Sequence, residues 1–315
     1  MYKFEPIRKT LVWGTESWVL SGVPGFESVV AEGPEAGRKI TELFPGEFPL
    51  LVKFIDAKRD LSIQVHPDDA LALKRHGCRG KSEMWYVLDT APGAKLISGL
   101  KSALTPDEYV RLVAEDRITE VLAEHEVAPG DVFFLPAGRI HSIGGGCYLA
   151  EVQQTSDITY RIYDYNRPGL DGKPRQLHTE LAKDAIDYQV YPDYRTHYEA
   201  RVDEPVELVR CPQFTVDLVD LSPSYNETRQ RTAERKLVFR QTCPKNNFRP
   251  PVWKTPSAAS SFLILIGVSG SGTVRSPQGE TALAEGEAVL LTEGDLSGFS
   301  LIPGPGGLRL LSAHI

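Results

Sequence analysis

Two glycine-led segments of this sequence share one pattern, and together they constrain its fold more than any other feature. Residues 130–141 read GDVFFLPAGRIH, and residues 286–297 read GEAVLLTEGDLS. Each has a glycine, an acidic residue, a short apolar run and a second glycine, which is typical of a buried strand between two turns. The first copy ends in His141 and the second in Ser297. We therefore expect two related β-structures, of which only the first carries a histidine.

A second pair of segments precedes these two in the same order. Residues 82–96, SEMWYVLDTAPGAKL, resemble residues 261–274, SFLILIGVSGSGTV, because a serine and an apolar run lead into a glycine-containing turn. Ser261 stands roughly where Glu83 stands in the first copy. Such repeats indicate similar structural units. A mainly β protein of two small barrels is therefore predicted.

The first half differs from the second by a longer spacer with helical signals. Residues 105–108, TPDE, match a capping box with proline at the first helical position, and apolar residues follow at helical spacing. This predicts a helical insertion around residues 100–126 in the first barrel. Periodicity is lost near residues 191–205, which suggests an N-terminal domain of residues 1–195 and a C-terminal domain of residues 196–315.

Composition limits the partners and the compartment. The net charge of −7 argues against a nucleic-acid partner, because such partners usually need a concentrated basic face. Neither a secretory signal nor an apolar run long enough for a membrane span is visible in the sequence. Its four cysteines are scattered and form no disulfide framework, so a cytoplasmic location is expected. The oligomeric state is expected to be a monomer or a homodimer.

The segment LSIQVHPDD, residues 61–69, places polar side chains on one face of a strand. Alternation puts Ser62, Gln64 and His66 together, opposite three apolar residues. Buried polar groups cost free energy unless they are paired, and a metal ion would pair them. With Glu83 and His141, the ligand set would suit Zn²⁺ or Fe²⁺ with an open position. A single histidine on a strand is more often hydrogen-bonded than bound to a metal.

The segment AEVQQTSDITYRIYDYNR, residues 150–167, is rich in charge and tyrosine. Alone it would be a solvated strand pair with cross-strand ion pairs. Beside a metal site, Arg161 and Arg167 become candidates for binding an anion or stabilising negative charge. Lys81, two residues before Glu83, would project along the same strand and is a candidate for binding phosphate or transferring a proton.

Several motifs together resemble one family. The pattern G-x₅-P-x-G-x-x-H at residues 130–141 is a signature of the cupin superfamily. The further motifs are WGTESWVLS (13–21), PLLVKFIDAKRDLSIQVHPDD (49–69), GKSEMWYV (80–87) and QQTSDITYRIYDYNR (153–167). In this order they resemble type I mannose-6-phosphate isomerases in their short bacterial form. The resemblance implies two cupin-type jelly-roll β-barrels.

The resemblance also implies a reaction and roles for single residues. Mannose 6-phosphate and fructose 6-phosphate would be interconverted through an enediolate. One Zn²⁺ per chain would be held in the N-terminal barrel by Gln64, His66, Glu83 and His141, and none in the C-terminal barrel. Arg161 would be catalytic, and Lys81, Glu151 or a zinc-bound water would be the base. The residues expected near the phosphate or the sugar are Ser62, Lys81 and Arg167.

Two other functions compete with the isomerase. A non-catalytic cupin that binds sugar phosphates would keep the barrel, although a pure binder has no need for both the metal set and Arg161. An Fe²⁺ cupin oxygenase is compatible with two histidines and one carboxylate. Gln64 and the neighbouring basic residues disfavour it.

Overall fold

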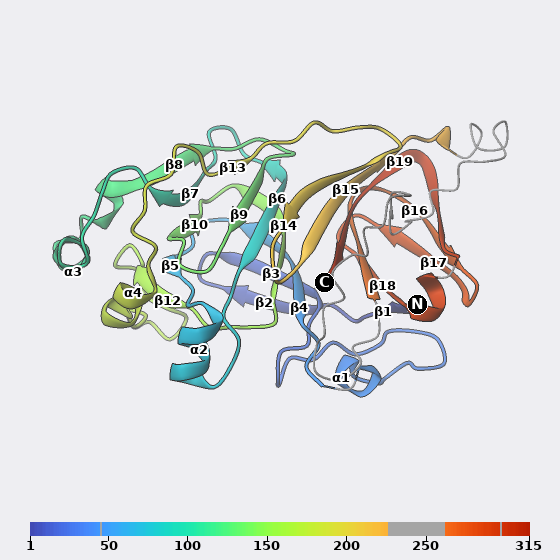
Figure 1. Ribbon diagram of the computed structural model, residues 1–315, viewed down its shortest axis with the longest axis horizontal. Coiled ribbons are helices and arrows are strands. Elements are labelled where there is room, and N and C mark those ends of the chain that lie inside the picture. Colours follow the sequence, from blue (N-terminus) through green and yellow to red (C-terminus); the bar gives the residue numbers. More distant parts are fainter. Residues whose placement is uncertain (45, 226–261, 297) are drawn as a thin grey trace, which may run out of the picture. The chain divides into compact units, whose positions relative to one another are not determined.

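The protein is mainly β, and its strands belong to two compact units (Figure 1). The computed structural model describes residues 1–44, 46–225, 262–296 and 298–315. The first unit comprises Pro6–Ser28 and Phe48–His197, and the second comprises Met1–Glu5, Val29–Glu47 and Tyr198–Ile315. Residues 1–5 and 29–47 therefore pack with the second unit, although a division at residue 195 would assign them to the first.

The first unit consists of two antiparallel sheets, as expected for a cupin-type jelly roll. Its smaller sheet contains, in spatial order, β12 (Tyr160–Tyr163), β5 (Ile63–Val65), β10 (His141–Ile143), β7 (Lys95–Leu100) and β8 (Leu122–Glu126). Its larger sheet contains β13 (Arg195–Thr196), β9 (Val132–Leu135), β6 (Glu83–Thr90), β11 (Cys147–Gln154), β4 (Leu50–Ala57), β3 (Gly14–Leu20) and β2 (Ile7–Leu11). Side chains from both sheets meet in the interior, where the candidate site lies.

The turn between β9 and β10 shows why the PAG motif is needed. Arg139 N donates to Pro136 O at 3.0 Å, which closes the turn. Gly138, at its third position, has a φ of 91°, and a Cβ there would lie 3.0 Å from Ala185 O. A type II turn needs positive φ at this position, which glycine adopts without strain. Gly138 N also donates to His66 O at 2.9 Å, so the turn holds β10 beside the end of β5.

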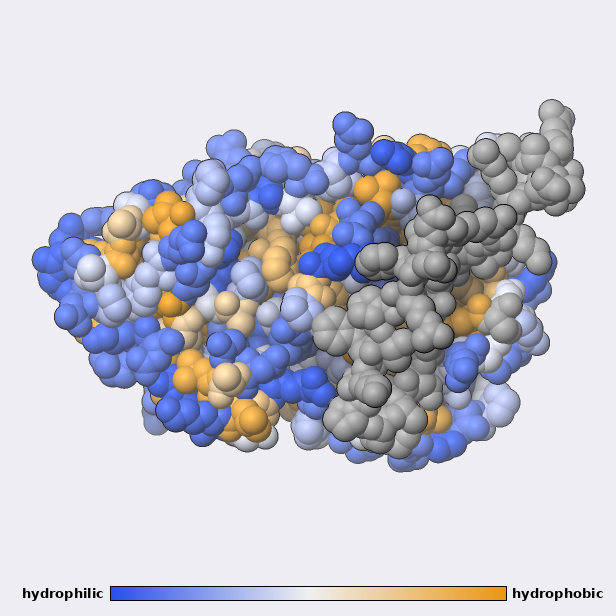
Figure 2. Space-filling model, in the orientation of Figure 1, coloured by the Kyte–Doolittle hydropathy of each residue, from blue (hydrophilic) through white to orange (hydrophobic). Residues whose placement is uncertain are grey.

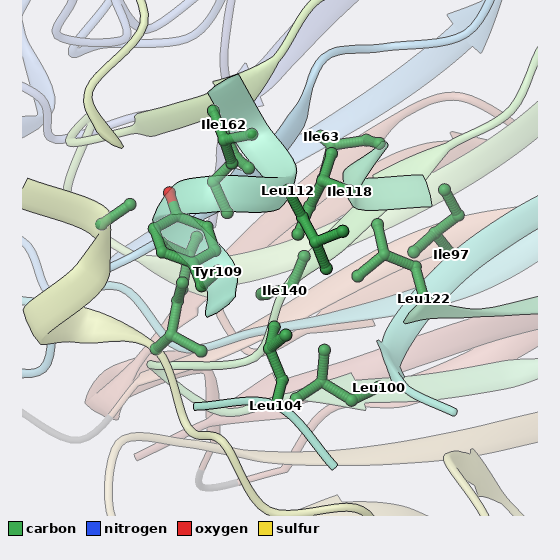
Figure 3. Close-up of a cluster of buried hydrophobic side chains, with 14 of the residues drawn as sticks. Ile63, Ile97, Leu100, Leu104, Tyr109, Leu112, Ile118, Leu122, Ile140 and Ile162 are labelled. Atoms are coloured by element: carbon green, nitrogen blue, oxygen red, sulfur yellow. The ribbon is translucent and has the colours of Figure 1, made fainter. Parts of the chain in front are cut away.

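The predicted helical insertion is present but only partly helical. α3 (Pro106–Ala114) begins at Thr105 with the expected capping box, in which both reciprocal hydrogen bonds form. The 3₁₀ helix η1 (Ile118–Val121) follows and leads directly into β8. Figure 3 shows the apolar face of α3 packed with η1 against side chains of the smaller sheet. Burial of these apolar side chains stabilises the insertion against the barrel.

Helices also lie outside the insertion. α2 (Asp69–His76) begins at Asp68, whose side chain accepts from Leu71 N, and ends at Gly77 in the left-handed conformation. α4 (Thr179–Ala185) was not expected from the sequence. α1 (Ile40–Leu43) is only one turn long.

The second unit contains one seven-stranded antiparallel sheet in the described part of the chain. Its strands are β1 (Tyr2–Lys3), β18 (Ala288–Thr292), β16 (Phe262–Ser276), β19 (Ser300–His314), β15 (Thr215–Leu221) and β14 (Pro205–Arg210), with β17 (Gly279–Ala284) paired to β16. β16 and β18 repeat the antiparallel pairing of β6 and β9.

Two details of the second copy differ from the sequence-based expectation. The glycines at 267–272 form no turn, because β16 continues through them with irregularities in its register to β19. After β18 the chain enters the one-turn helix α6 (Glu293–Leu296) in place of a glycine turn. Ser261 and Ser297, which were compared with Glu83 and His141, lie outside the described residues.

The surface is mixed in character. In Figure 2 the apolar side chains on the visible face form separate spots among hydrophilic ones. The most exposed large apolar side chains, Leu73, Leu170 and Val202, come from widely separated parts of the sequence. Within the described ranges, the helices are too short or too polar to cross a membrane.

Candidate active site

The structure brings the two predicted histidines together inside the first unit. His141 begins β10 and pairs in register with Gln64 of β5, and His66 follows β5 directly. The two imidazole rings lie with their centroids 4.8 Å apart, and both side chains are buried. The Gly138 turn and the pairing of β5 with β10 therefore account for the proximity of the histidines.

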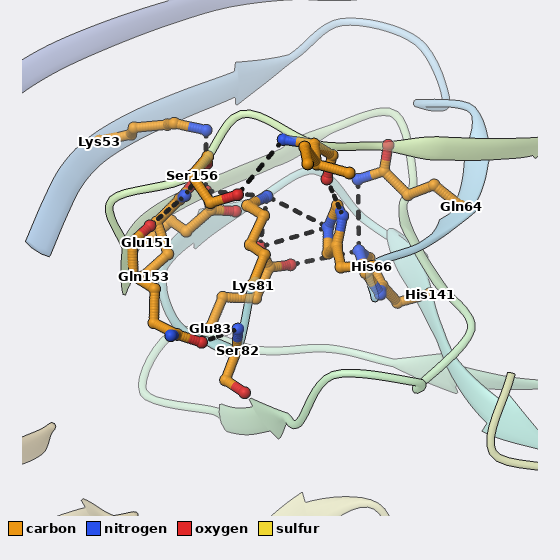
Figure 4. Close-up of polar contacts among 12 residues, drawn as sticks. Lys53, Gln64, His66, Lys81, Ser82, Glu83, His141, Glu151, Gln153 and Ser156 are labelled. Atoms are coloured by element: carbon orange, nitrogen blue, oxygen red, sulfur yellow. Dashed lines mark hydrogen bonds and ion pairs between the residues drawn. The ribbon is translucent and has the colours of Figure 1, made fainter. Parts of the chain in front are cut away.

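Glu83 approaches both histidines from the opposite sheet (Figure 4). Its carboxylate oxygens lie 3.2 Å from His141 Nε2 and 3.6 Å from His66 Nε2. One possible ligand atom from each of the three residues lies within 4.8 Å of the others. Among the histidine, cysteine and acidic side chains in the described part of the chain, these three residues are close enough to hold a metal ion.

Backbone carbonyls fix the orientation of both imidazoles. His66 Nδ1 lies 2.7 Å from Ile158 O, and His141 Nδ1 lies 2.8 Å from Arg139 O. A carbonyl only accepts, so each Nδ1 carries the proton and each Nε2 directs its lone pair toward Glu83. Burial, followed by the charge of Lys81, lowers the pKa of His141 to about 3 and that of His66 well below its usual value. Both rings are therefore neutral near pH 7.

This arrangement suits a cation. Two nitrogen lone pairs and a carboxylate converge in a buried space, where only a nearby positive charge offsets their repulsion. Lys81 supplies such a charge on the side of His66 and Glu83 Oε2. Glu83 Oε1, which faces His141 Nε2 at 3.2 Å, has no hydrogen-bond partner within the described ranges. The nitrogen and oxygen donors match those of zinc sites with an open position, and the carbonyl contacts are typical of metal-binding histidines.

Gln64 lies beside this group, as predicted. Its Nε2 is 3.2 Å from His141 Nε2. A half-turn of the amide exchanges its nitrogen and oxygen and would direct Oε1 toward the same space. Gln64 is thus close enough to supply a fourth ligand.

A buried network of charges borders the three ligands. Lys81 Nζ lies 3.1 Å from His66 Nε2 and 4.0 Å from Glu151 Oε1. Glu151 Oε1 lies 3.0 Å from Lys53 Nζ, and its Oε2 accepts from Trp85 Nε1 at 2.9 Å. Burial alone would raise the pKa of Glu151, but Lys53 and Lys81 hold that pKa well below its usual value. Burial, with the charge of Glu151, raises the pKa of Glu83.

Arg161 lies at the edge of the pocket. It pairs in register with Gln64 across β12 and β5, so the two side chains share one face of the sheet. Its Nη1 donates to Gln176 O at 2.9 Å. Its Nε is buried and has no hydrogen-bond partner among the described residues. Arg161 therefore has a donor free for a group that enters the pocket.

The other two predicted substrate residues are placed differently. Ser62 is buried directly before β5, two residues from Gln64. Arg167 has its guanidinium on Asp164, with Nη2 2.8 Å from Oδ1, and Nη1 donates to Asp60 O. The contacts of Arg167 are thus with the loop after β12 and with the segment before β5, and not with the metal ligands.

Two residues that contact the predicted site residues were missed from the sequence. Lys53 faces Glu151 in the register of β4 and β11, and its ammonium is buried. Burial tends to lower the pKa of Lys53, but Glu151 and other nearby carboxylates raise it above its usual value, so it is a fixed positive charge. A lysine inside the apolar run LLVKFI was the available signal. His178, whose Nδ1 accepts from Arg161 N at 3.0 Å, gave no such signal.

Comparisons with known proteins point to one family. Residues 26–89 match the family model described as phosphomannose isomerase type I, catalytic domain. The mannose-6-phosphate isomerase ManA of Bacillus subtilis (strain 168) is 33% identical over an alignment of 258 residues, and the match covers 72% of this chain and 82% of the relative. The chain belongs to the type I mannose-6-phosphate isomerase family. The resemblance based on the motifs is thereby confirmed.

Other similar proteins support the assignment. The mannose-6-phosphate isomerase of Streptococcus mutans is 38% identical over an alignment of 182 residues, and the match covers 54% of this chain and 57% of that protein. The crystal structure of the mannose 6-phosphate isomerase from Bacillus subtilis superimposes with a TM-score of 0.79 at 27% identity and covers 100% of this chain and 99% of its own. The predicted mainly β cupin architecture is thus confirmed.

Proposed function

We propose that this chain interconverts mannose 6-phosphate and fructose 6-phosphate in the pocket of the first unit. The observation that carries the proposal is the convergence of His66 Nε2, His141 Nε2 and Glu83 within 4.8 Å, next to Lys81. An aldose–ketose isomerisation needs a centre that stabilises negative charge on two neighbouring oxygens and a group that moves a proton between two carbons. The pocket offers both, and membership of the family supports the choice of substrate.

The metal we propose is one Zn²⁺ per chain, held by His66, Glu83 and His141 with Gln64 as a fourth ligand. When bound, it would act as a Lewis acid that stabilises negative charge on the sugar oxygens during the enediolate stage. The imidazoles need no deprotonation before binding, because burial keeps their pKa values low. Their carbonyl contacts hold the rings in position.

The chain's own residues would handle the proton and the remaining charge. Lys81 and Glu151 are the candidates for moving the proton between C2 and C1, since both lie beside the ligands and 4.0 Å from each other. Lys53 would keep Glu151 ionised through its contact at 3.0 Å. Arg161 would stabilise oxygen charge with its unpartnered Nε. Ser62, Lys81 and Arg167 remain the proposed contacts to the sugar and its phosphate.

A coupled assay tests the proposal directly. Protein loaded with Zn²⁺ should convert mannose 6-phosphate to fructose 6-phosphate, and removal of the metal with a chelator should abolish turnover. Full activity of the metal-free protein would contradict the metal proposal. Metal-loaded protein that binds the sugar phosphate without turnover would favour the alternative, a non-catalytic sugar-phosphate-binding cupin.

A further inference from the structure

Outside the metal pocket, the loop after β12 gathers basic side chains around one carboxylate. Asp164 Oδ1 accepts from Arg167 Nε at 3.0 Å and from Arg167 Nη2 at 2.8 Å. It also accepts from Arg175 Nη2 at 2.5 Å, while Asp164 Oδ2 accepts from Arg175 Nε at 2.6 Å. Asp164 is 5% exposed. One buried carboxylate therefore fixes two guanidinium groups.

Arg161 connects this cluster to the metal pocket. Its Nη1 donates to the carbonyl of Gln176, the residue next to Arg175. Burial, followed by the charge of Arg175, lowers the pKa of Arg161, and Arg167 acts in the same direction. On its other side, Arg161 is paired in register with Gln64. A ligand that reaches from the metal ligands past Arg161 would therefore meet Arg175 and Arg167.

The charge of the cluster is not balanced internally. Asp164 is ion-paired with Arg167 and Arg175, and its charge also acts on the nearby Arg161, so three guanidinium groups and one carboxylate leave two positive charges in excess. The side chains of Arg167 and Arg175 are 15% and 22% exposed, so solvent reaches both. A phosphate monoester carries about −1.5 to −2 charges at pH 7, and arginine binds its oxygens through pairs of N–H groups. The excess charge matches such a dianion.

The backbone of the loop is held in an unfavourable conformation. Tyr165 and Asn166 have φ angles of 56° and 53°, a region that non-glycine residues rarely adopt. Such residues persist where surrounding contacts over-determine them, and they concentrate at ligand-binding loops. Here the contacts of Asp164 with Arg167 and Arg175 span the strained residues.

We propose that Arg167 and Arg175, held in place by Asp164, bind the phosphate group of the hexose phosphate, with Arg161 between them and the reacting end of the sugar. The proposal rests on the proposed function for its substrate. It adds Arg175 as a binding residue and Asp164 as a positioning residue. In the open-chain sugar the phosphate is on C6, whereas the proton moves between C2 and C1 at the other end. A phosphate site separated from the metal ligands by Arg161 fits this distance.

The first experiment measures steady-state kinetics of the Zn²⁺-loaded Arg175→Ala variant. The loss of charge-assisted hydrogen bonds should raise KM for mannose 6-phosphate and the inhibition constant of inorganic phosphate by ~10-fold to ~100-fold. Because Arg175 is remote from the proton transfer, kcat should change less than KM. Arg117→Ala, an exposed arginine paired with Glu115 and Glu120, is the matched control and should leave all constants unchanged. Unchanged KM and phosphate inhibition in Arg175→Ala would overturn the proposal.

Calorimetry with inorganic phosphate separates this proposal from the isomerase activity. Wild-type protein should bind phosphate at low ionic strength, and Arg175→Ala should bind it at least ~10-fold more weakly. If the wild type binds phosphate through Arg175 but does not isomerise, only the proposed activity fails. If it isomerises while Arg175→Ala binds phosphate normally, only the phosphate site fails. Arg175→Lys keeps the charge and should recover part of the affinity, which controls for folding.

Asp164→Asn tests the positioning role. This substitution removes a negative charge, so electrostatics alone would make phosphate binding tighter. If Asp164 serves to position the two guanidinium groups, binding should become weaker and KM should rise, with little change in kcat. Tighter phosphate binding by a folded Asp164→Asn variant would remove Asp164 from the proposal.

Discussion

The two units use the same strand pairing around very different interiors. β6 pairs with β9 in the first unit as β16 pairs with β18 in the second. At the start of β9, Gly130 has a φ of 94° and donates to Val87 O, and at the start of β18, Gly286 has a φ of 81° and donates to Gly267 O. The repeat in the sequence therefore specifies the same backbone geometry twice.

The difference lies in the side chains that fill each interior. The first unit buries charged and polar groups, among them Lys53, His66, Glu83, His141 and Glu151. In the described residues of the second unit, the core consists largely of leucine, valine and phenylalanine, including Leu263, Leu265, Val289, Leu291 and Leu310. Buried polar groups cost free energy unless they are paired, whereas apolar groups stabilise by burial alone. One copy thus has the composition of a site and the other that of a core.

The strongest test of this contrast is removal of a metal ligand in the first unit. His141→Ala should lose bound Zn²⁺ and lower kcat/KM for mannose 6-phosphate by ~10³-fold or more, because Lewis-acid stabilisation is worth several kcal/mol. Metal analysis of the purified protein and the coupled assay would measure this. His314→Ala, in the second unit, is the control and should keep both metal and activity. Equal loss of zinc from both variants would contradict the assignment of the metal to the first unit.

The next largest effect concerns Arg161, at the edge of the pocket. Arg161→Ala should lower kcat by ~10²-fold to ~10³-fold, as expected for a donor to developing oxygen charge. Zinc content should stay at the wild-type level, since Arg161 is not among the ligands. Stopped-time assays and metal analysis on the same preparation would show both. A variant with wild-type kcat would exclude Arg161 from the chemistry.

A third test concerns the buried ion pair of the first unit. Glu151→Gln leaves the ammonium of Lys53 unpaired and should lower the free energy of unfolding by about 3–5 kcal/mol near neutral pH. Because the folded-state pKa of Glu151 lies below its usual 4.5, its contribution is fully present above that pH and is lost as the pH falls through the lowered pKa. Urea unfolding at several pH values should therefore show the two proteins converging in acid. A constant difference would mean that Glu151 does not titrate as an ionised partner of Lys53.

A fourth test applies to the apolar interior. Leu265→Ala removes a fully buried side chain of the second unit and should cost about 2–5 kcal/mol through the cavity it leaves. Zinc content and the pH dependence of activity should be unchanged, since no polar group is disturbed. Denaturant unfolding gives the free energy. A change in zinc affinity as large as the change in stability would argue that the two interiors do not act independently.

The smallest effect is expected in the helical insertion between β7 and β8 of the first unit. Thr105→Ala removes the side chain that accepts from Glu108 N at 3.2 Å and should cost about 1 kcal/mol. Activity should stay within twofold of wild type, roughly the error of the assay, if the insertion only covers the barrel. A much larger loss of activity would assign the insertion a part in the reaction.

Local features of this protein were determined by its sequence. The capping box at Thr105, the glycine turn before His141 and the alternation that places Gln64 beside His66 depend on neighbours within a few residues, so they could be predicted. The motif set predicted the family and four clustered ligand candidates. α4 was missed, since its helix begins without a side-chain cap at His178.

Only the tertiary structure decided how these residues act. The carbonyl of Ile158 fixes the tautomer of His66 from 92 residues away, and Lys53 meets Glu151 across two strands far apart in sequence. Likewise, Arg175 reaches Asp164 because the loop folds back on itself, which no spacing in the sequence indicated. Charge balance and proton position depend on which distant groups share a buried space. The sequence therefore specified the ligand types, and the fold determined their charge, orientation and partners.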